Sequence, residues 1–251
     1  MKVVLFMLAR NEEEMIVYSL RHYKQFCAEM TVMDLGSTDK TMDIARSFGA
    51  AVQQHDSGGE FRDSLNMKLR NVCWHGTDAD WVIVVDCDEL MHFGAGVNET
   101  LSSYDEQKVA VVKPVGYEMC ADEFPTGDGQ ITDYVKMGKR DAEWYSKPTT
   151  FSPKRVAALD FGTGAHVVTA TLHGGRKLLV DNRTPPNTPT TKLLHMHHLG
   201  SVERIGAKYE AVIARLSPEN RRMRWGIQRD GLGHSRDKRR AIMAKLERVL
   251  P

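Results

Sequence analysis

Three carboxylates lie within four residues of the sequence, directly behind an apolar run. Asp86, Asp88 and Glu89 follow the segment WVIVV, which spans residues 81–85. An ionised carboxylate is costly to bury without compensation, and no cluster of lysine and arginine adjoins these three in sequence. Carboxylates two positions apart at a strand end point to the same side, so Asp86 and Asp88 can share one Mg²⁺ or Mn²⁺ ion. The pattern allows two interpretations, a metal site that holds a diphosphate or an acidic turn exposed to water.

The residues before this motif alternate between strand and helix signals. The apolar runs predict strands at 2–8, 30–35, 50–54 and 81–86, and the helical periodicity predicts helices at 12–27, 39–48 and 61–75. Asn11 is expected to cap the first helix, whose early acidic residues complement the helix dipole.

The third predicted helix offers two faces. Leu65, Leu69 and Val72 are expected to share an apolar face, with Asn66 and Arg70 on a neighbouring one.

Short connections between alternating strands and helices predict an α/β fold with a doubly wound, mainly parallel central sheet. The strand at 81–86 is apolar on both faces, which is typical of a central strand covered by helices on each side. Ligands of such sheets bind at the carboxyl ends of the strands. Asp34, Asp86 and Asp88 all lie at or just beyond such ends.

Length and composition indicate an ordinary globular protein. The chain has 251 residues, of which 41% are hydrophobic and 27% charged, as expected for one large α/β domain. No apolar window is long enough for a membrane span, and residues 2–8 are too short for a secretory signal. The four cysteines form no C-x-x-C pair, which favours reduced thiols and a cytoplasmic protein.

Charge is distributed unevenly along the chain. From Gly200 onward, 13 lysines and arginines stand against six acidic residues, so residues 1–199 carry a net charge of −6 when the whole chain carries +1. The connector TPPNTPTT, residues 184–191, precedes this basic end. Residues 200–251 are therefore expected to form a basic helical C-terminal extension.

Four segments together resemble glycosyltransferases of the GT-A fold that are similar to family 2, the nucleotide-diphospho-sugar transferases. They are ARNEE (9–13), VMDLGSTDKT (32–41), LRN (69–71) and DADWVIVVDCDEL (78–90). The resemblance implies a Rossmann-like sheet and a metal-dependent transfer of sugar from a nucleotide-diphosphate sugar, with a UDP-sugar favoured, to a hydroxyl acceptor. It implies a catalytic domain over 1–199, with the nucleotide-sugar half at 1–93 and the acceptor half at 94–199.

The resemblance also implies which residues bind the nucleotide. Ala9, Arg10, Asn11 and Glu12 would line the base and phosphate site, where a helix N-terminus favours phosphate. Asp34 would accept hydrogen bonds from the base or ribose. A simple helix cap at Asn11 and a simple turn former at Asp34 are the alternatives.

Arg70 matches an arginine that contacts base or phosphate in similar proteins. Arg62 and Lys68 are substitutes for it, and a solvated helix face is the alternative for all three.

Three histidines lie in the late segment LLHMHHLGSVERIGAKY, residues 193–209. His195 and His197 share one face of a predicted strand and His198 faces the other way. The resemblance implies that a late-strand histidine completes the metal shell, with His197 favoured and His195 next. His166 is expected on the acceptor side or as a packed structural residue.

The reaction itself needs stabilisation of the departing diphosphate and, for inversion, a base. Lys147 and Arg70 are expected to stabilise the leaving group together with the metal. Asp122 or Glu123, in the loop CADEFPTGDGQ, is expected to accept the proton of the acceptor hydroxyl, with Glu89 as a rival.

Two other classes of protein share parts of this pattern. A sugar-phosphate nucleotidyltransferase requires a glycine-rich basic loop after the first strand, whereas LARNEEE is acidic. A non-enzymatic nucleic-acid-binding protein would use the basic end but leaves Asp86 and Asp88 unexplained.

The basic end also bears on the acceptor. Arg221, Arg222, Arg224 and Arg229 surround Trp225, so DNA or RNA is one candidate acceptor. The alternative is that the basic end is a solvated helical cap on the sheet and the acceptor is a saccharide or a protein.

Overall fold

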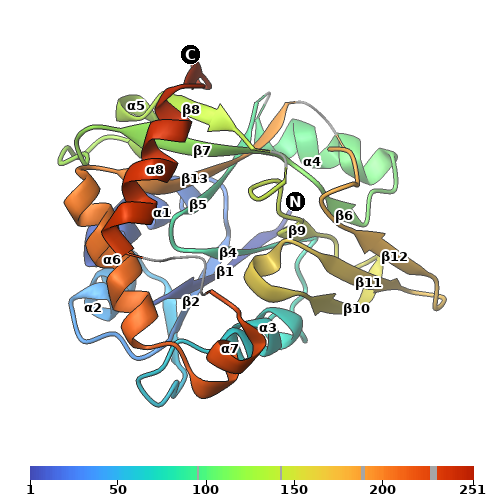
Figure 1. The fold of residues 1–251 in the computed structure, drawn as a ribbon. Coiled ribbons are helices and arrows are strands. Elements are labelled where there is room, and N and C mark those ends of the chain that lie inside the picture. The colour runs from blue at the N-terminus through green and yellow to red at the C-terminus, as the bar shows by residue number, and fades with distance from the viewer. Residues whose placement is uncertain (95, 142, 188–189, 227–230) are drawn as a thin grey trace.

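The protein has a mixed α/β fold built on two large sheets (Figure 1), which confirms the predicted fold class at this level. The computed structural model describes residues 1–94, 96–141, 143–187, 190–226 and 231–251. Arg229 therefore lies outside the described residues.

The first sheet has six strands in the order β3–β2–β1–β4–β9–β6. Its strands are β1 Val3–Ala9, β2 Glu29–Asp34, β3 Ala51–Gln54, β4 Trp81–Asp86, β6 Val111–Val112 and β9 Thr150–Phe151. The first four are parallel, and their register places Ala9 beside Asp34 and Leu8 beside Asp86. The carboxyl ends of β1, β2 and β4 therefore meet at one edge, where parallel sheets bind ligands.

The second sheet has five strands in the order β14–β8–β7–β13–β5. Its strands are β5 Glu89–Phe93, β7 Val115–Ala121, β8 Met137–Arg140, β13 Thr191–Leu199 and β14 Glu247–Arg248. Because β4 ends at Asp86 and β5 begins at Glu89, the chain crosses from one sheet to the other within the acidic motif. The strand with the late histidines, β13, lies between β7 and β5.

The helices fill the connections between these strands and cover the sheets (Figure 1). They are α1 Glu13–Tyr23, α2 Thr41–Ser47, α3 Asp63–Val72, α4 Val97–Glu106, α5 Ile131–Tyr134, α6 Val202–Ala214, α7 Pro218–Met223 and α8 Gly231–Met243, with a 3₁₀ turn η1 at Thr163–Ala165. Helices α6 and α8 pack against each other.

Strand β4 is buried on both faces, as its sequence predicts. Ile83 and Val85 pack into one hydrophobic core with residues of α1 and α4, whereas Val82 and Val84 pack into a second core. The second core contains α3 and a three-stranded antiparallel sheet, β10 Val156–Phe161, β11 Val168–Leu172 and β12 Lys177–Val180. The prediction of helices on both faces is therefore wrong for part of this face, because a small sheet covers it.

The predicted elements of the first half are present with shifted ends, but two local expectations are wrong. Glu12, not Asn11, is the N-cap residue of α1; Asn11 has a positive φ of 52° and its side chain accepts a hydrogen bond from the Thr38 amide at 2.7 Å. Val72 is 45% exposed because it lies in the last turn of α3, outside the apolar face.

Gly116 of β7 fixes the loop that leads into the candidate site. Its amide donates to Ser146 Oγ at 2.9 Å, and its carbonyl accepts from the Asp141 amide at 3.0 Å. A Cβ atom at this position would lie 2.0 Å from the carbonyl carbon of Tyr145. Since the clash is with backbone, side-chain rotation cannot relieve it.

We expect Gly116→Ala to lower the free energy of unfolding by about 3 kcal/mol, because the loop must move away from the strand. Gly162→Ala is the matched control, since its Cβ would approach no atom closer than 3.6 Å and its φ is −76°. Urea denaturation of both variants measures the difference. Equal stability of the two would contradict the close approach at Gly116.

Candidate functional site

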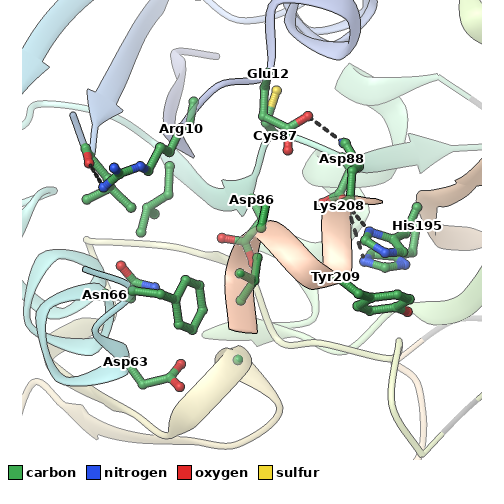
Figure 2. A pocket seen from close by; sticks show the side chains of 18 of the residues that line it. Arg10, Glu12, Asp63, Asn66, Asp86, Cys87, Asp88, His195, Lys208 and Tyr209 are labelled. Carbon is green, nitrogen blue, oxygen red and sulfur yellow. Dashed lines mark hydrogen bonds and ion pairs between the residues drawn. The ribbon is translucent and has the colours of Figure 1, made fainter. Parts of the chain in front are cut away.

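A cavity of about 610 Å³ opens at the carboxyl ends of β1 and β4. Figure 2 shows Asp86 in its centre, Arg10 and Asn66 on one side, and His195 and Tyr209 on the other. Helices α3 and α6 contribute walls, so segments far apart in sequence enclose it. Asp86 and Asp88 both line the cavity, at the carboxyl edge of the sheet where the sequence places them.

Asp86 is compensated by Arg70. The two side chains form an ion pair between β4 and α3. Arg70 is only 2% exposed, whereas the Asp86 side chain is 34% exposed to the cavity. A solvated helix face is therefore wrong for Arg70. Since removing Asp86 would leave a buried guanidinium unpaired, Asp86 also stabilises the fold.

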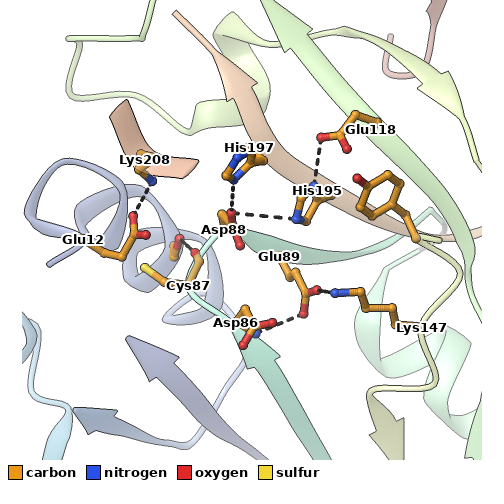
Figure 3. A network of polar contacts seen from close by, with 12 residues as sticks. Glu12, Asp86, Cys87, Asp88, Glu89, Glu118, Lys147, His195, His197 and Lys208 are labelled. Carbon is orange, nitrogen blue, oxygen red and sulfur yellow. Dashed lines mark hydrogen bonds and ion pairs between the residues drawn. The ribbon is translucent and has the colours of Figure 1, made fainter. Parts of the chain in front are cut away.

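Asp88 lies opposite two histidines of β13 (Figure 3). Its Oδ2 accepts a hydrogen bond from His197 Nδ1 at 3.3 Å and lies 3.8 Å from His195 Nε2. Burial alone would raise the pKa of Asp88, but the two histidines lower it well below its ordinary value. The carboxylate therefore stays ionised and faces two imidazole rings.

His195 is held by a second carboxylate. Its Nδ1 donates to Oε1 of Glu118 at 2.8 Å, and Glu118, on the neighbouring strand β7, is only 1% exposed. This bond leaves Nε2 directed at Asp88, which is the arrangement that metal-binding histidines usually have. Burial alone would lower the pKa of His195, but Glu118 and Asp88 raise it.

His197 and His198 face opposite sides, as predicted. His197 lines the cavity, and burial lowers its pKa to about 4 despite the bond to Asp88. Its Nε2 is buried without a hydrogen-bond partner among the described residues. His198 is fully buried outside the cavity lining, where its carbonyl accepts a hydrogen bond from Arg239.

Glu89 is paired with Lys147 in the interior (Figure 3). Their side chains are 1% and 7% exposed, and the second oxygen of Glu89 accepts from the Asp86 amide at 3.0 Å. Burial alone would lower the pKa of Lys147, but Glu89 and Asp86 raise it. Both oxygens of Glu89 are thus engaged, one by Lys147 and the other by the Asp86 amide, which argues against Glu89 as the base.

The loop after β1 lines the cavity with Ala9, Arg10, Asn11 and Glu12, as the resemblance implies. Glu12 pairs with Lys208 of α6 at 2.7 Å, an interaction with no local sequence signal. Burial alone would lower the pKa of Lys208, whereas Glu12 and Asp88 raise it.

Asp34 is fully buried, outside the cavity lining. Its carboxylate accepts from the amides of Gly36 and Ser37, each at 3.1 Å, as a turn former does. The next residue, Leu35, lines the cavity instead. The expected contact between Asp34 and a base or ribose is therefore wrong in this geometry.

Asp122 and Glu123 also lie outside the cavity lining. The Asp122 side chain is 83% exposed and accepts from Arg239 of α8 at 2.7 Å. Glu123 is exposed to solvent. The structure gives no support to either as the base, because both are exposed on the loop after β7 and neither lines the cavity.

The remaining predicted residues divide between the cavity and its surroundings. Arg62 and His166 line the cavity, whereas Lys68 is exposed on α3 and lies outside it. Sequence reasoning missed Glu118, Asp141, Trp144, Tyr145 and Lys208.

Many cations of the C-terminal segment are engaged within the fold. Arg204 pairs with Glu14 at 2.7 Å, and Arg239 with Asp122. Arg221 donates to the carbonyls of Leu216 and Ile213. The contacts of Arg204 and Arg239 attach the segment to α1 and to the loop after β7, those of Arg221 lie within the segment, and none of them supports nucleic-acid binding.

The donor atoms around Asp88 fit a divalent ion whose remaining coordination positions would be filled by water and by substrate oxygens. No group of three or more His, Cys, Asp or Glu side chains in the described parts of the chain forms a ready-made metal cage. Mg²⁺ and related ions commonly take one or two protein carboxylates and fill the other positions with water and phosphate. Asp88 with one imidazole is consistent with that pattern.

Comparison with known proteins gives partial likenesses. No family model matches the chain. A stretch of 88 residues, 35% of this chain and 21% of the relative, is 32% identical to a TPR repeat-containing protein of Synechococcus elongatus.

One solved structure with partial likeness comprises residues 1–349 of TarS from S. aureus. It is 20% identical over a match that covers 61% of this chain and 47% of that chain, with a TM-score of 0.38. Another is glucosyl-3-phosphoglycerate synthase from Mycobacterium tuberculosis in complex with Mn²⁺, UDP and glucosyl-3-phosphoglycerate. It is 21% identical over a match that covers 36% of this chain and 34% of that chain, with a TM-score of 0.28. The chain spans about a fifth of the curated relative and less than half of these structures. Such values leave the activity to be inferred from the site.

Within the described residues, none of the helices combines the length and the apolar character that crossing a membrane requires.

We expect Lys147→Met to lower the free energy of unfolding by about 3–5 kcal/mol, because it leaves Glu89 buried and uncompensated. The double variant Glu89→Gln/Lys147→Met removes both charges and keeps an acceptor for the Asp86 amide, so it should cost less than the single change. Urea denaturation gives both values. A double variant less stable than Lys147→Met would show that the charge on Glu89 is not the cause.

Proposed function

We propose that the protein is a metal-dependent glycosyltransferase that moves a sugar from a nucleotide-diphosphate sugar, with a UDP-sugar favoured, to a hydroxyl acceptor. The observation that carries the proposal is the position of Asp88, at the carboxyl edge of the parallel sheet and opposite two imidazoles of β13. A carboxylate and imidazole nitrogens are ligands that a divalent ion accepts, and an ion at such an edge would in turn hold a diphosphate.

The donor is assigned to the side of the cavity nearer β1. The loop from Ala9 to Glu12 and the side chain of Leu35 line this side, and Asn66 of α3 is 7% exposed towards it. Arg70, Lys147 and Lys208 lie around the acidic turn, but each is paired with a carboxylate, so the metal ion would supply the positive charge that a diphosphate needs. The nucleotide is thus assigned to residues 1–93, with help from the extension at 200–251.

The metal is assigned to Asp88 and a histidine, with Mn²⁺ or Mg²⁺ as the ion. When bound, such an ion neutralises the diphosphate and stabilises the charge that it gains on leaving. Asp86 contributes its free carboxylate edge at the centre of the cavity, while Arg70 holds its position.

His195 is the better supported of the two histidines. Glu118 fixes its ring through Nδ1 and leaves Nε2 towards Asp88. His197 uses Nδ1 for the contact with Asp88, and its Nε2 is the buried atom that lacks a hydrogen bond. The order favoured from the sequence, His197 before His195, is therefore reversed in this proposal.

We expect Glu118→Gln to weaken Mn²⁺ binding by about 10-fold or more, because losing an outer-shell carboxylate commonly has that effect. Electron paramagnetic resonance of free Mn²⁺, titrated with protein in the presence of UDP, measures the affinity. His198→Ala is the control, since His198 lies outside the cavity lining. Unchanged affinity in Glu118→Gln would remove His195 from the metal site.

We expect UDP with Mn²⁺ to raise the melting temperature of the protein. At a UDP concentration 100 times Kd the stabilisation is about 2.7 kcal/mol, which for this chain length corresponds to about 5–10 °C. Asp88→Ala should abolish the shift and the slow hydrolysis of a UDP-sugar, whereas Asp122→Ala should keep both. A screen of UDP-, GDP- and dTDP-sugars identifies the donor. A shift that persists in Asp88→Ala would refute the metal–diphosphate assignment.

A further inference from the structure

We infer that the acceptor is a neutral saccharide and that Asp141 is the base that accepts the proton of its hydroxyl group. The inference rests on the proposed function and adds to it a substrate class and a catalytic residue. It starts from the side of the cavity opposite the donor loop, where Asp141, Trp144 and Tyr145 form the wall.

A short series of contacts places Asp141 near the acidic turn. His195 lies 3.8 Å from Asp88, and the Tyr145 ring stacks on His195 with centroids 4.4 Å apart. The Tyr145 amide in turn donates to the Asp141 carbonyl at 3.1 Å. Asp141 is thus separated from Asp88 by two stacked rings along one wall.

Asp141 differs from the other acidic side chains that line the cavity. Each of the others accepts a hydrogen bond from a partner side chain: Asp86 from Arg70, Asp88 from His197, Glu12 from Lys208, Glu60 from Arg62 and Asp63 from Asn220. Asp141 Oδ1 accepts from the Trp144 amide at 3.1 Å, which fixes the side chain. Its Oδ2 forms an ion pair with Lys139 at 3.7 Å, which is longer than a hydrogen bond, so this oxygen can still receive a proton.

Trp144 gives this wall the surface that a sugar ring requires. Its side chain is 48% exposed although it lines the cavity, and its ring meets His166 edge-on with centroids 5.3 Å apart. An exposed indole face binds the apolar C–H face of a saccharide while the sugar hydroxyls reach polar neighbours. His166 then supports Trp144 on the acceptor side, which is one of its two expected roles.

The charges at this end favour a neutral acceptor. Lys238 donates to the Tyr145 hydroxyl at 2.7 Å and lies 3.8 Å from Glu118. Lys139 faces Asp141 itself. Both lysines are therefore balanced by carboxylates, and a phosphorylated acceptor would gain little from them.

The proposed transfer is a direct displacement at the anomeric carbon. The acceptor O–H bond breaks and its proton passes to Oδ2 of Asp141, while the oxygen lone pair forms a bond to the anomeric carbon. The bond from that carbon to the diphosphate breaks, and its electron pair leaves with the nucleoside diphosphate. The configuration at the anomeric carbon is inverted, and Asp141 then releases the proton to solvent.

The test measures nucleoside diphosphate release from the donor identified by the hydrolysis screen. The acceptors are methyl glycosides of glucose, galactose, mannose and xylose, with glucose 6-phosphate as the anionic comparison. Asp141→Asn keeps the acceptor atom for the Trp144 amide, so it should fold normally. Glu143→Gln is the matched control, because Glu143 is an exposed carboxylate of the same loop.

We expect a neutral glycoside to stimulate release and to give an inverted product. Asp141→Asn should lower kcat by about 100-fold or more, with UDP affinity within about twofold of the wild type. Glu143→Gln should behave as the wild type. Trp144→Ala should raise the acceptor KM about tenfold, with kcat little changed, and Trp144→Phe should restore it.

Other results would overturn the inference in distinct ways. A retained anomeric configuration, or Asp141→Asn activity within about threefold of the wild type, would exclude Asp141 as the base. Stimulation by glucose 6-phosphate alone, or by none of the acceptors, would exclude a neutral saccharide. In each case UDP binding that depends on Asp88 would leave the proposed function standing. Failure of the wild type to bind UDP with Mn²⁺ would instead reject both.

Discussion

The acidic turn between β4 and β5 needs compensation for three carboxylates, and the rest of the site is arranged around that need. Arg70 of α3 pairs with Asp86, the histidines of β13 face Asp88, and Lys147 pairs with Glu89. Each partner comes from a different element. Because unpaired buried charge is strongly destabilising, these elements must occupy their observed positions together.

The same turn also joins the two sheets, so electrostatics and topology are linked. Strand β4 belongs to the parallel sheet and β5 pairs with β13 in the other. The Asp88 carbonyl accepts from the Met196 amide at 2.7 Å, which ties the turn to the histidine strand. The side chains of Asp88 and His195 are thereby carried on hydrogen-bonded backbone, which is a more rigid support than a free loop.

The sequence predicts what depends on local pattern and misses what depends on distant partners. Strand β4 and its two-sided burial follow from apolar residues in succession, and the position of Asp86 follows from the strand end. Glu118 has no local sequence signal, because its partner His195 is 77 positions away. Asp122 has the residue type of a base, but its distance from the site is set by the packing of β7 and α8. Asn11 fits a helix cap by type, yet the turn at Thr38 uses its side chain instead.

The pairing of Glu12 with Lys208, 196 positions apart, has a consequence for how the chain folds. Residues 1–93 contain the acidic groups, whereas Lys147, the histidines of β13 and Lys208 come later in the chain. In a half-length intermediate Arg70 can compensate Asp86, but Glu12, Asp88 and Glu89 lack their later partners, which leaves an excess of negative charge at the sheet edge. Non-local contacts of this kind slow folding, since long loops must close, at a cost in entropy, before the stabilising contacts can form. We expect the parallel sheet to reach its final order late, in a step shared with the last helices, and not as an independently stable half.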